Sequence, residues 1–229
     1  MVRRTKEEAQ ETRHKLLDAA EYLFQLQGVS RTSLQDIARR AGATRGAVYW
    51  HFKDKADLFN AMMERVTLPM EQCFLQKESM QAASDTGEDA LLHIREATRI
   101  ALKQIVDDAQ TRRVFEVATH KVEYVEELQA VRLRHLSIRN DFLSRIEFGL
   151  ETASKQLGLQ LAVSASTAAQ GLHALIDGLI QNWLLDSSAF DLLDVGCAVN
   201  DVYLRGLGLE NPSNKTSPAT AERLLTPQD

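Results

Sequence analysis

The chain has 229 residues, of which 44% are hydrophobic and 26% charged, with only 4 Pro. This composition is ordinary for a soluble globular protein with one large or two small domains. The N-terminus is polar and basic, and no stretch approaches the ~18 apolar residues that a membrane span needs, so we expect neither a signal peptide nor a membrane contact. We expect a cytoplasmic protein.

The two cysteines, Cys73 and Cys197, are far apart in the sequence and form no metal-ligand spacing. Such usage fits a reducing compartment better than a disulfide framework. The net charge of −5 conceals an asymmetry, because residues 1–66 are mildly basic and the remainder is acidic. A basic end on an acidic body suits binding to phosphate, although chance variation gives the same pattern.

Capping signals mark a series of helices in the N-terminal part of the chain. No stretch alternates apolar and polar residues for long, so we expect no strands. The predicted helices run from the capping box at Thr5 to Gly28, from the capping box at Thr32 to Gly42, from a Thr44 cap to Trp50 or His51, and from an Asp54 cap past Met63 to a break at Pro69.

The helices predicted beyond this point are longer. They span about 87–107, 111–119, 123–157, 164–185 and 190–207, with Gly158 closing the longest and Ser164 capping the next. The tail 211–229 is rich in Pro, Ser, Thr and Asn, so we expect it to be disordered. These patterns predict an all-α fold.

The segment 33–52 has the pattern of a helix-turn-helix. Gly42 can take the positive φ that a tight turn requires, and Ala38 is small where the two helices cross. Ile37 and Val48 fill the space between the helices, so the second helix is free to enter a DNA major groove. Short helical pairs with a central glycine also occur in other proteins, and the pattern alone leaves both interpretations open.

The residues around this second helix suit contact with double-stranded DNA. Arg45 has the geometry to pair with guanine, Lys55 and the following helix N-terminus can bind one phosphate, and a basic N-terminal arm can enter the minor groove. The predicted DNA-binding residues are Arg3, Arg4, Thr32, Ser33, Thr44, Arg45, Gly46, Tyr49, Trp50, His51 and Lys55.

This stretch resembles the TetR family of bacterial regulators. The matching residues are Ile37-Ala38, Ala41-Gly42, Thr44-Arg45-Gly46, Tyr49, His51-Phe52, Lys55 and Leu58, with Ala43 where the family commonly has Val. The run RGAVYWHFKDKADLF is similar to the AcrR-like and TtgR-like subgroup, which represses multidrug efflux pumps. Weaker similarity continues at 112–123 and 177–185.

The resemblance implies an N-terminal three-helix helix-turn-helix DNA-binding domain at 1–56. A C-terminal helical ligand-binding and dimerisation domain would follow at 57–210, before the tail 211–229. It also implies a repressor that binds a palindromic operator as a homodimer, controls an efflux pump operon and is released by small hydrophobic drugs.

The helix at 164–185 is apolar on more than one face, so it must be buried on several sides. One side can pack on its own domain. Another can meet the same helix of a second subunit, with the helix at 190–207 completing a four-helix dimer interface and Gly171 and Gly178 allowing close approach. An entirely intramolecular core is the alternative, and the resemblance favours the dimer.

His173 and Asp177 share one face of this apolar helix. An acid in an apolar surrounding needs a partner or a purpose, and the resemblance implies that Asp177 lines a drug pocket. Asp177 then orients a ligand by hydrogen bonding or attracts a cation; the alternatives are a structural pair with His173 and exposure in the loops between helices. The predicted ligand-binding residues are Val66, Ile94, Ala97, Ala101, Phe115, Ala118, Thr119, Phe142, Ile146, His173 and Asp177.

Three rival functions are considered beside the ligand-responsive repressor. An enzyme is not expected, because there is no ordered Ser-His-Asp set, phosphate-binding glycine loop or metal-ligand spacing, and no cofactor is expected either. A redox sensor would use Cys73 or Cys197, but lone cysteines are usually inert. An activator of the same architecture has the same sequence pattern.

Overall fold

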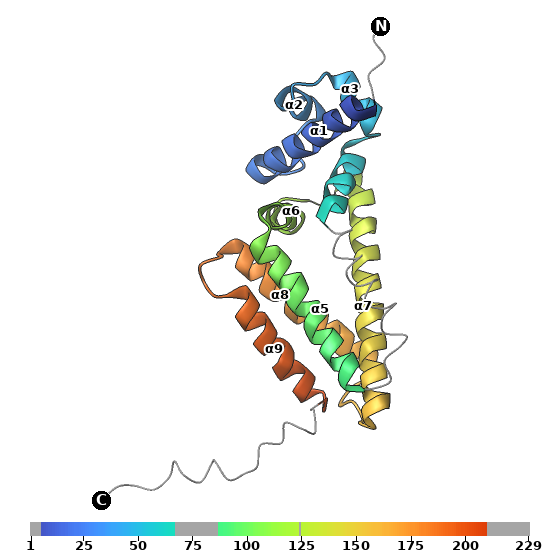
Figure 1. The fold of residues 1–229 in the computed structure, drawn as a ribbon. Coiled ribbons are helices and arrows are strands. Elements are labelled where there is room, and N and C mark those ends of the chain that lie inside the picture. Colours follow the sequence, from blue (N-terminus) through green and yellow to red (C-terminus); the bar gives the residue numbers. More distant parts are fainter. Residues whose placement is uncertain (1–5, 67–86, 124, 210–229) are drawn as a thin grey trace, which may run out of the picture.

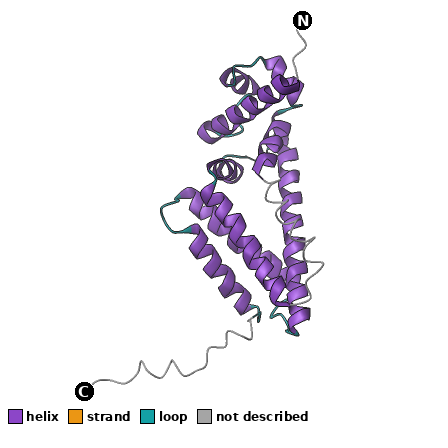
Figure 2. Cartoon of the chain, viewed as in Figure 1, coloured by secondary structure: helices purple, strands orange, loops and turns teal. Residues whose placement is uncertain are grey.

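The computed structural model describes residues 6–66, 87–123 and 125–209 (Figure 1). These residues form helices and connecting loops, without a strand among them (Figure 2), which confirms the all-α prediction. In chain order they are α1 Lys6–Gln27, α2 Leu34–Arg40, α3 Arg45–His51, a helix at 55–66, α5 Gly87–Asp107, α6 Ala109–His120, a 3-10 turn Glu126–Leu128, α7 Gln129–Leu157, α8 Ala165–Leu185 and α9 Leu192–Gly206.

Most helix ends lie where their capping residues predict them. The Thr44 and Ser164 side chains cap α3 and α8, and Gly158 ends α7 in the left-handed conformation with φ 62°. The cap of α2 was predicted one residue too early. Ser33, not Thr32, is the N-cap, and it forms a reciprocal capping box with Asp36.

The start of α7 was predicted several residues too early. The chain forms a 3-10 turn at Glu126–Leu128 before α7 begins at Gln129. The expectations for Pro69, Cys73 and the tail 211–229 lie outside the described residues.

The head of the molecule consists of α1, α2, α3 and the helix at 55–66, which surround one apolar core. Phe24 of α1 and Phe59 of the helix at 55–66 lie with ring centroids 6.0 Å apart. The same core takes in Val114 and Val117 of α6, both fully buried. Helix α6 therefore lies directly beneath the head, as Figure 1 shows.

The body consists of α5, α7, α8 and α9, in which α5 packs between α7 and α9. Its buried residues form two separate clusters. One, around Leu150 and Leu204, lies at the end far from the head, and the other, around Ile105 and Trp183, lies near α6. No described helix of the body or head is long and apolar enough to cross a membrane.

The close packing of α8 and α9 depends on Gly171. A Cβ at this position would lie 2.1 Å from the Tyr203 hydroxyl, which donates a hydrogen bond to the Ala168 carbonyl at 2.9 Å. The expectation that Gly171 serves approach by a second subunit is therefore corrected, because its space is filled within the chain. A Cβ at Gly178 would meet nothing within 4 Å.

Candidate nucleic-acid interface and ligand cavity

The turn between α2 and α3 fixes the orientation of α3 on the head. Gly42 has φ 65°, and the Ala43 N–H donates to the Ala38 carbonyl at 2.9 Å. Ile37 and Val48 are fully buried on either side of this turn. The inner face of α3 is thus anchored in the core, and its opposite face is left to solvent.

The outer face of α3 carries polar and aromatic side chains that reach solvent. Arg45, Tyr49 and Trp50 are exposed, Trp50 to 72%. The Arg45 guanidinium donates to the Tyr49 hydroxyl at 3.3 Å. A Cβ at Gly46 would have the Thr44 hydroxyl at 3.8 Å as its nearest neighbour, so the backbone here is open to close approach. A short helix with this exposed face has the dimensions and donors to lie in a DNA major groove.

Two of the predicted DNA contacts turn inward instead. Thr32 is 1% exposed, and its hydroxyl donates to the Gly28 carbonyl at 2.7 Å. Lys55 is 7% exposed, and its ammonium donates to the Ser30 and Thr32 carbonyls, both at 3.4 Å. The prediction that these two side chains contact DNA is therefore corrected. They satisfy loop carbonyls and hold the α1–α2 connection against the helix at 55–66.

The remaining predicted contacts are placed differently from one another. Ser33 is exposed and caps α2. His51 is half-buried and lies edge-on to the Trp50 ring, with centroids 4.5 Å apart. Arg3 and Arg4 lie outside the described residues. The exposed part of the candidate interface is therefore centred on α3.

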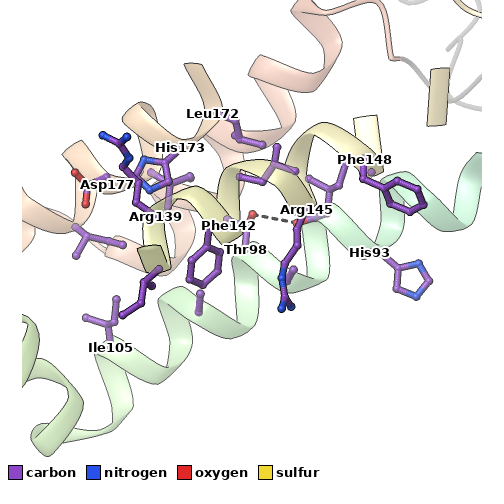
Figure 3. A pocket seen from close by; sticks show the side chains of 18 of the residues that line it. His93, Thr98, Ile105, Arg139, Phe142, Arg145, Phe148, Leu172, His173 and Asp177 are labelled. Atoms are coloured by element: carbon purple, nitrogen blue, oxygen red, sulfur yellow. Dashed lines mark hydrogen bonds between the residues drawn. The ribbon is translucent and has the colours of Figure 1, made fainter. Parts of the chain in front are cut away.

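A cavity of about 570 Å³ lies in the body between α5, α7 and α8 (Figure 3), and its lining also includes Met63 of the helix at 55–66 and Phe115 of α6. This size is within the range of pockets that hold drug-sized molecules. Most of the predicted pocket residues line it: Ile94, Ala97, Ala101, Phe115, Phe142, Ile146, His173 and Asp177.

Three predicted pocket residues lie elsewhere. Val66 and Ala118 are buried in the head core, and Thr119 is half-buried on α6 outside the lining. Phe115 reaches the cavity with a long side chain, whereas the short side chains of Ala118 and Thr119 lie one turn further along α6. The prediction that these three line the cavity is wrong for two reasons: Val66, at the end of the helix at 55–66, packs into the head core, and of the predicted α6 residues only Phe115 reaches the cavity.

The sequence interpretation missed several polar side chains of the lining. They are His93, Thr98, His135, Arg139 and Arg145, from α5 and α7. Charged residues on a long helix are usually part of its solvent face, which is why none was predicted. Their register is the signal that could have found them, because Arg139 and Arg145 recur at helical spacing with Phe142 and Ile146.

His173 and Asp177 both line the cavity, and their electrostatic states differ. Burial lowers the pKa of His173; the Asp177 carboxylate opposes this shift, and Arg139 and His135 add to it. The imidazole is therefore neutral at pH 7. Asp177 is exposed, and its carboxylate accepts a hydrogen bond from the Gln181 amide at 2.5 Å.

Helix α6 is held by both the body and the head. On the body side, the His120 imidazole lies 3.2 Å from the Gln181 carbonyl. On the head side, the Val29 N–H donates to the Lys121 carbonyl at 3.0 Å, and the Gln25 amide donates to Glu116 at 2.8 Å.

A buried carboxylate adds a further link between head and body. Glu21 of α1 accepts hydrogen bonds from Arg65 at 2.7 Å and from Gln110 of α6 at 2.9 Å. Burial raises the pKa of Glu21, while Gln110 and Arg65 oppose the shift. The Glu21 carboxylate therefore joins α1, α6 and the helix at 55–66. Because it is buried, the loss of any one of its hydrogen bonds is costly.

Cys197 of α9 has the environment of an unreactive thiol. Burial and the nearby Asp201 carboxylate raise its pKa. A thiol held in the protonated form is a poor nucleophile and a poor redox sensor. Among the residues that the structure describes, no group of three or more His, Cys, Asp or Glu is placed to hold a metal ion.

Comparison with protein families gives two matches that together cover most of the chain. Residues 16–62 match the bacterial regulatory proteins of the tetR family. Residues 89–208 match the C-terminal region of the MAATS-type transcriptional repressors. The first match contains α2 and α3, and the second contains the helices that line the cavity.

Individual relatives extend this likeness over nearly the full length. The HTH-type transcriptional regulator TtgR of Pseudomonas putida is 39% identical over 84% of this chain and 90% of its own. The crystal structure of NalD, the secondary repressor of the MexAB-OprM multidrug efflux pump in Pseudomonas aeruginosa, superposes with a TM-score of 0.77 at 35% identity, covering 88% of this chain and 98% of that one.

A third relative was solved with a small molecule. The complex of SmeT with triclosan superposes with a TM-score of 0.72 at 31% identity, covering 90% of this chain and 98% of that one. SmeT is the repressor of the multidrug efflux pump SmeDEF of Stenotrophomonas maltophilia.

Proposed function

Because the chain belongs to the TetR family of bacterial regulatory proteins, we propose that it represses its target genes as a homodimer on a palindromic operator. A hydrophobic compound that enters the cavity releases it. The observation that carries this proposal is that one chain joins an exposed α3 to a cavity of about 570 Å³, with Phe115 of α6 and Met63 of the helix at 55–66 contacting both the head core and the cavity.

The chain is a transcriptional repressor of the TetR type and not an enzyme, as its relatives are regulators. We place its action in the cytoplasm, on the chromosome. The proposed target is a multidrug efflux operon, because NalD and SmeT are repressors of such pumps.

A second copy of the chain is proposed to pack on α8 and α9. Leu185 and Val202 are 70% and 59% exposed on these helices, and the open space over Gly178 allows close backbone approach. A two-fold dimer presents two α3 helices to successive major grooves, about 34 Å apart, and the operator must then be palindromic.

Control by a ligand is proposed to pass through α6. A compound in the cavity contacts Phe115 of α6 and lies beside α8, which is bonded to His120. If the ligand binds better when α6 is displaced, the contacts of Gln25 in α1 and of Val29 just after it carry the head with it. The operator affinity falls by the difference in ligand affinity between the two states.

The test is an electrophoretic mobility shift of the purified protein on the DNA upstream of its own gene, with and without a panel of hydrophobic antimicrobials. We expect tight binding in physiological salt, roughly tenfold to a hundredfold weaker binding by Arg45→Ala, and release by some compounds. Tight binding that no compound releases would contradict the proposed ligand response but not the proposed role as a repressor. Equally tight binding to unrelated DNA would contradict the proposal that the protein recognises a specific operator.

A further inference from the structure

The first turn of α6 carries two polar side chains that contact different parts of the molecule. Gln110 and Arg112 are two residues apart, so they do not share a helix face. The Asp108 carboxylate caps this turn, accepting the Gln110 N–H at 3.1 Å and the Thr111 N–H at 3.2 Å. A capped turn is held as one unit, so a displacement imposed on one of the two side chains is passed to the other.

Arg112 connects this turn to two helices of the cavity wall. Its guanidinium donates to the Ile105 carbonyl at 3.5 Å and to the Val106 carbonyl, both in the last turns of α5, where a cation is favourably placed. It also lies 5.1 Å from the centroid of the Trp183 ring of α8, within cation–π range. Because Ile105 itself lines the cavity, a change in the positions of α5 and α8 reaches Arg112 directly.

Gln110 connects the same turn to the head. Its amide donates to the Glu21 carboxylate at 2.9 Å, and the same carboxylate oxygen accepts a hydrogen bond from Arg65 at 2.7 Å. Glu21 is 3% exposed, so the loss of one of these bonds leaves a desolvated acceptor. Arg65 also donates to Asp18 at 2.7 Å, which ties the helix at 55–66 to α1. The position of Gln110 is therefore linked to that of two head helices.

These contacts form a continuous path from the end of α5 to the head. On the basis of the function proposed above, we propose that Gln110 and Arg112 are positioning residues that couple the body to the head, so that operator binding by α3 alters the surroundings of Trp183. The coupling is reciprocal, because a change at α5 and α8 that displaces Arg112 alters operator affinity by the same free energy. Unlike the cavity contact of Phe115, this path requires no contact between a ligand and α6.

The chain offers a reporter for this coupling that needs no ligand. Its two tryptophans are Trp50, 72% exposed on α3, and Trp183, 5% exposed beside Arg112. In full-length Trp50→Phe protein, tryptophan emission therefore reports on the body alone. It is followed while unlabelled duplex DNA from upstream of the protein's own gene is titrated to saturation. Anisotropy of the labelled duplex, measured in parallel, gives the bound fraction.

The variants are made in the Trp50→Phe background. Gln110→Leu removes the donor to Glu21 and leaves Trp183 and α3 in place, and Gln110→Asn is a milder second variant that keeps the amide but shortens its reach. Gln156→Leu is the matched control, because Gln156 is exposed on α7 outside the cavity lining. Arg112 is retained throughout, since its replacement would change the Trp183 emission directly.

We expect saturating operator DNA to change the Trp183 emission, both Gln110 variants to lose at least about two thirds of this change while still binding the operator, and Gln156→Leu to retain it. A purely structural role for Gln110 would lower stability but leave the emission change at saturation. Operator binding without a change in Trp183 emission, or a change that survives both Gln110 variants, would overturn the coupling and leave the repressor function intact. Failure of every variant and of the wild type to bind the operator would instead contradict the proposed function, and this inference with it.

Discussion

The head and the body of this molecule are both built of helices, but the head has a closed core and the body contains a cavity. In the head, Phe24, Ile37, Val48 and Phe59 close one continuous core, and α3 is held rigidly with its outer face in solvent. In the body, two buried clusters leave a cavity between α5, α7 and α8. A solid head presents a fixed surface, whereas a hollow body can change its contents, which is the division of labour that a ligand-controlled DNA-binding protein requires.

The sharpest test of this contrast removes one phenylalanine from each region. Phe24→Ala should lower the free energy of unfolding by about 3–5 kcal/mol, because it opens a cavity in a closed core. Phe142→Ala enlarges a cavity that already exists, so about 1–2 kcal/mol is expected. Urea denaturation followed by circular dichroism measures both. Equal losses would show that the body is packed as tightly as the head.

The next effect concerns DNA binding without a loss of stability. Arg45→Ala removes an exposed guanidinium from α3, and a lost bidentate base contact weakens binding by about 1–3 kcal/mol, or roughly tenfold to a hundredfold. Fluorescence anisotropy on labelled upstream DNA measures the change, with Arg132→Ala on α7 as the control. A variant that binds as tightly as wild type would remove Arg45 from the interface.

Substitutions at two glycines near the turn, Gly42 and Gly46, distinguish an effect on stability from an effect on DNA binding. Gly42→Ala places a Cβ at φ 65°, which costs about 1–2 kcal/mol of stability although no atom lies within 4 Å of it. Gly46→Ala is helical with open space, so stability is kept or raised while operator affinity falls. Thermal unfolding and anisotropy together measure the pair. If Gly46→Ala lowered stability and left operator affinity unchanged, while Gly42→Ala did the opposite, α3 would not face the DNA.

The smallest expected effect is the contribution of Glu21 to the pH dependence of the free energy of unfolding. Burial raises its pKa above the ordinary 4.5, so the folded chain holds this proton more tightly than the unfolded chain. Stability from this group therefore falls as the pH rises from about 4.5 through the folded-state pKa. Relative to Glu21→Gln, the wild type should lose free energy of unfolding over that window.

Glu11 on the same helix provides the control for this slope. It is exposed, and a hydrogen bond to Lys15 lowers its pKa, so Glu11→Gln should not reproduce the slope. Urea denaturation at a series of pH values measures both variants. A slope of the same sign at Glu11 would assign the effect to the net charge of the chain rather than to the buried link between head and body.

Local signals predicted the head well. Caps and the glycine turn act over a few residues, so Thr44, Gly42 and the exposed face of α3 followed from the sequence. The inward turn of Lys55 did not, because its partners are carbonyls more than twenty residues away. An exposed-looking lysine at a helix start gives no sign of such a contact.

The cavity was predicted less completely because tertiary packing creates it. The apolar and small residues of α5 and α7 were found through their helical spacing and the family resemblance, as Ala97 and Phe142 illustrate. Arg139 and Arg145 were missed, because only the packing of α7 against α5 and α8 places part of a charged helix face along the cavity.

We propose that occupancy of the body cavity controls DNA binding by the head. The most direct test is anisotropy titration of labelled operator DNA by the wild type and by Ala101→Trp, which fills part of the cavity, with a compound shown by direct titration to bind only the wild type. We predict that the compound weakens operator binding at least tenfold for the wild type and has no effect on Ala101→Trp. A compound that binds the wild-type cavity and leaves operator affinity unchanged would contradict the account.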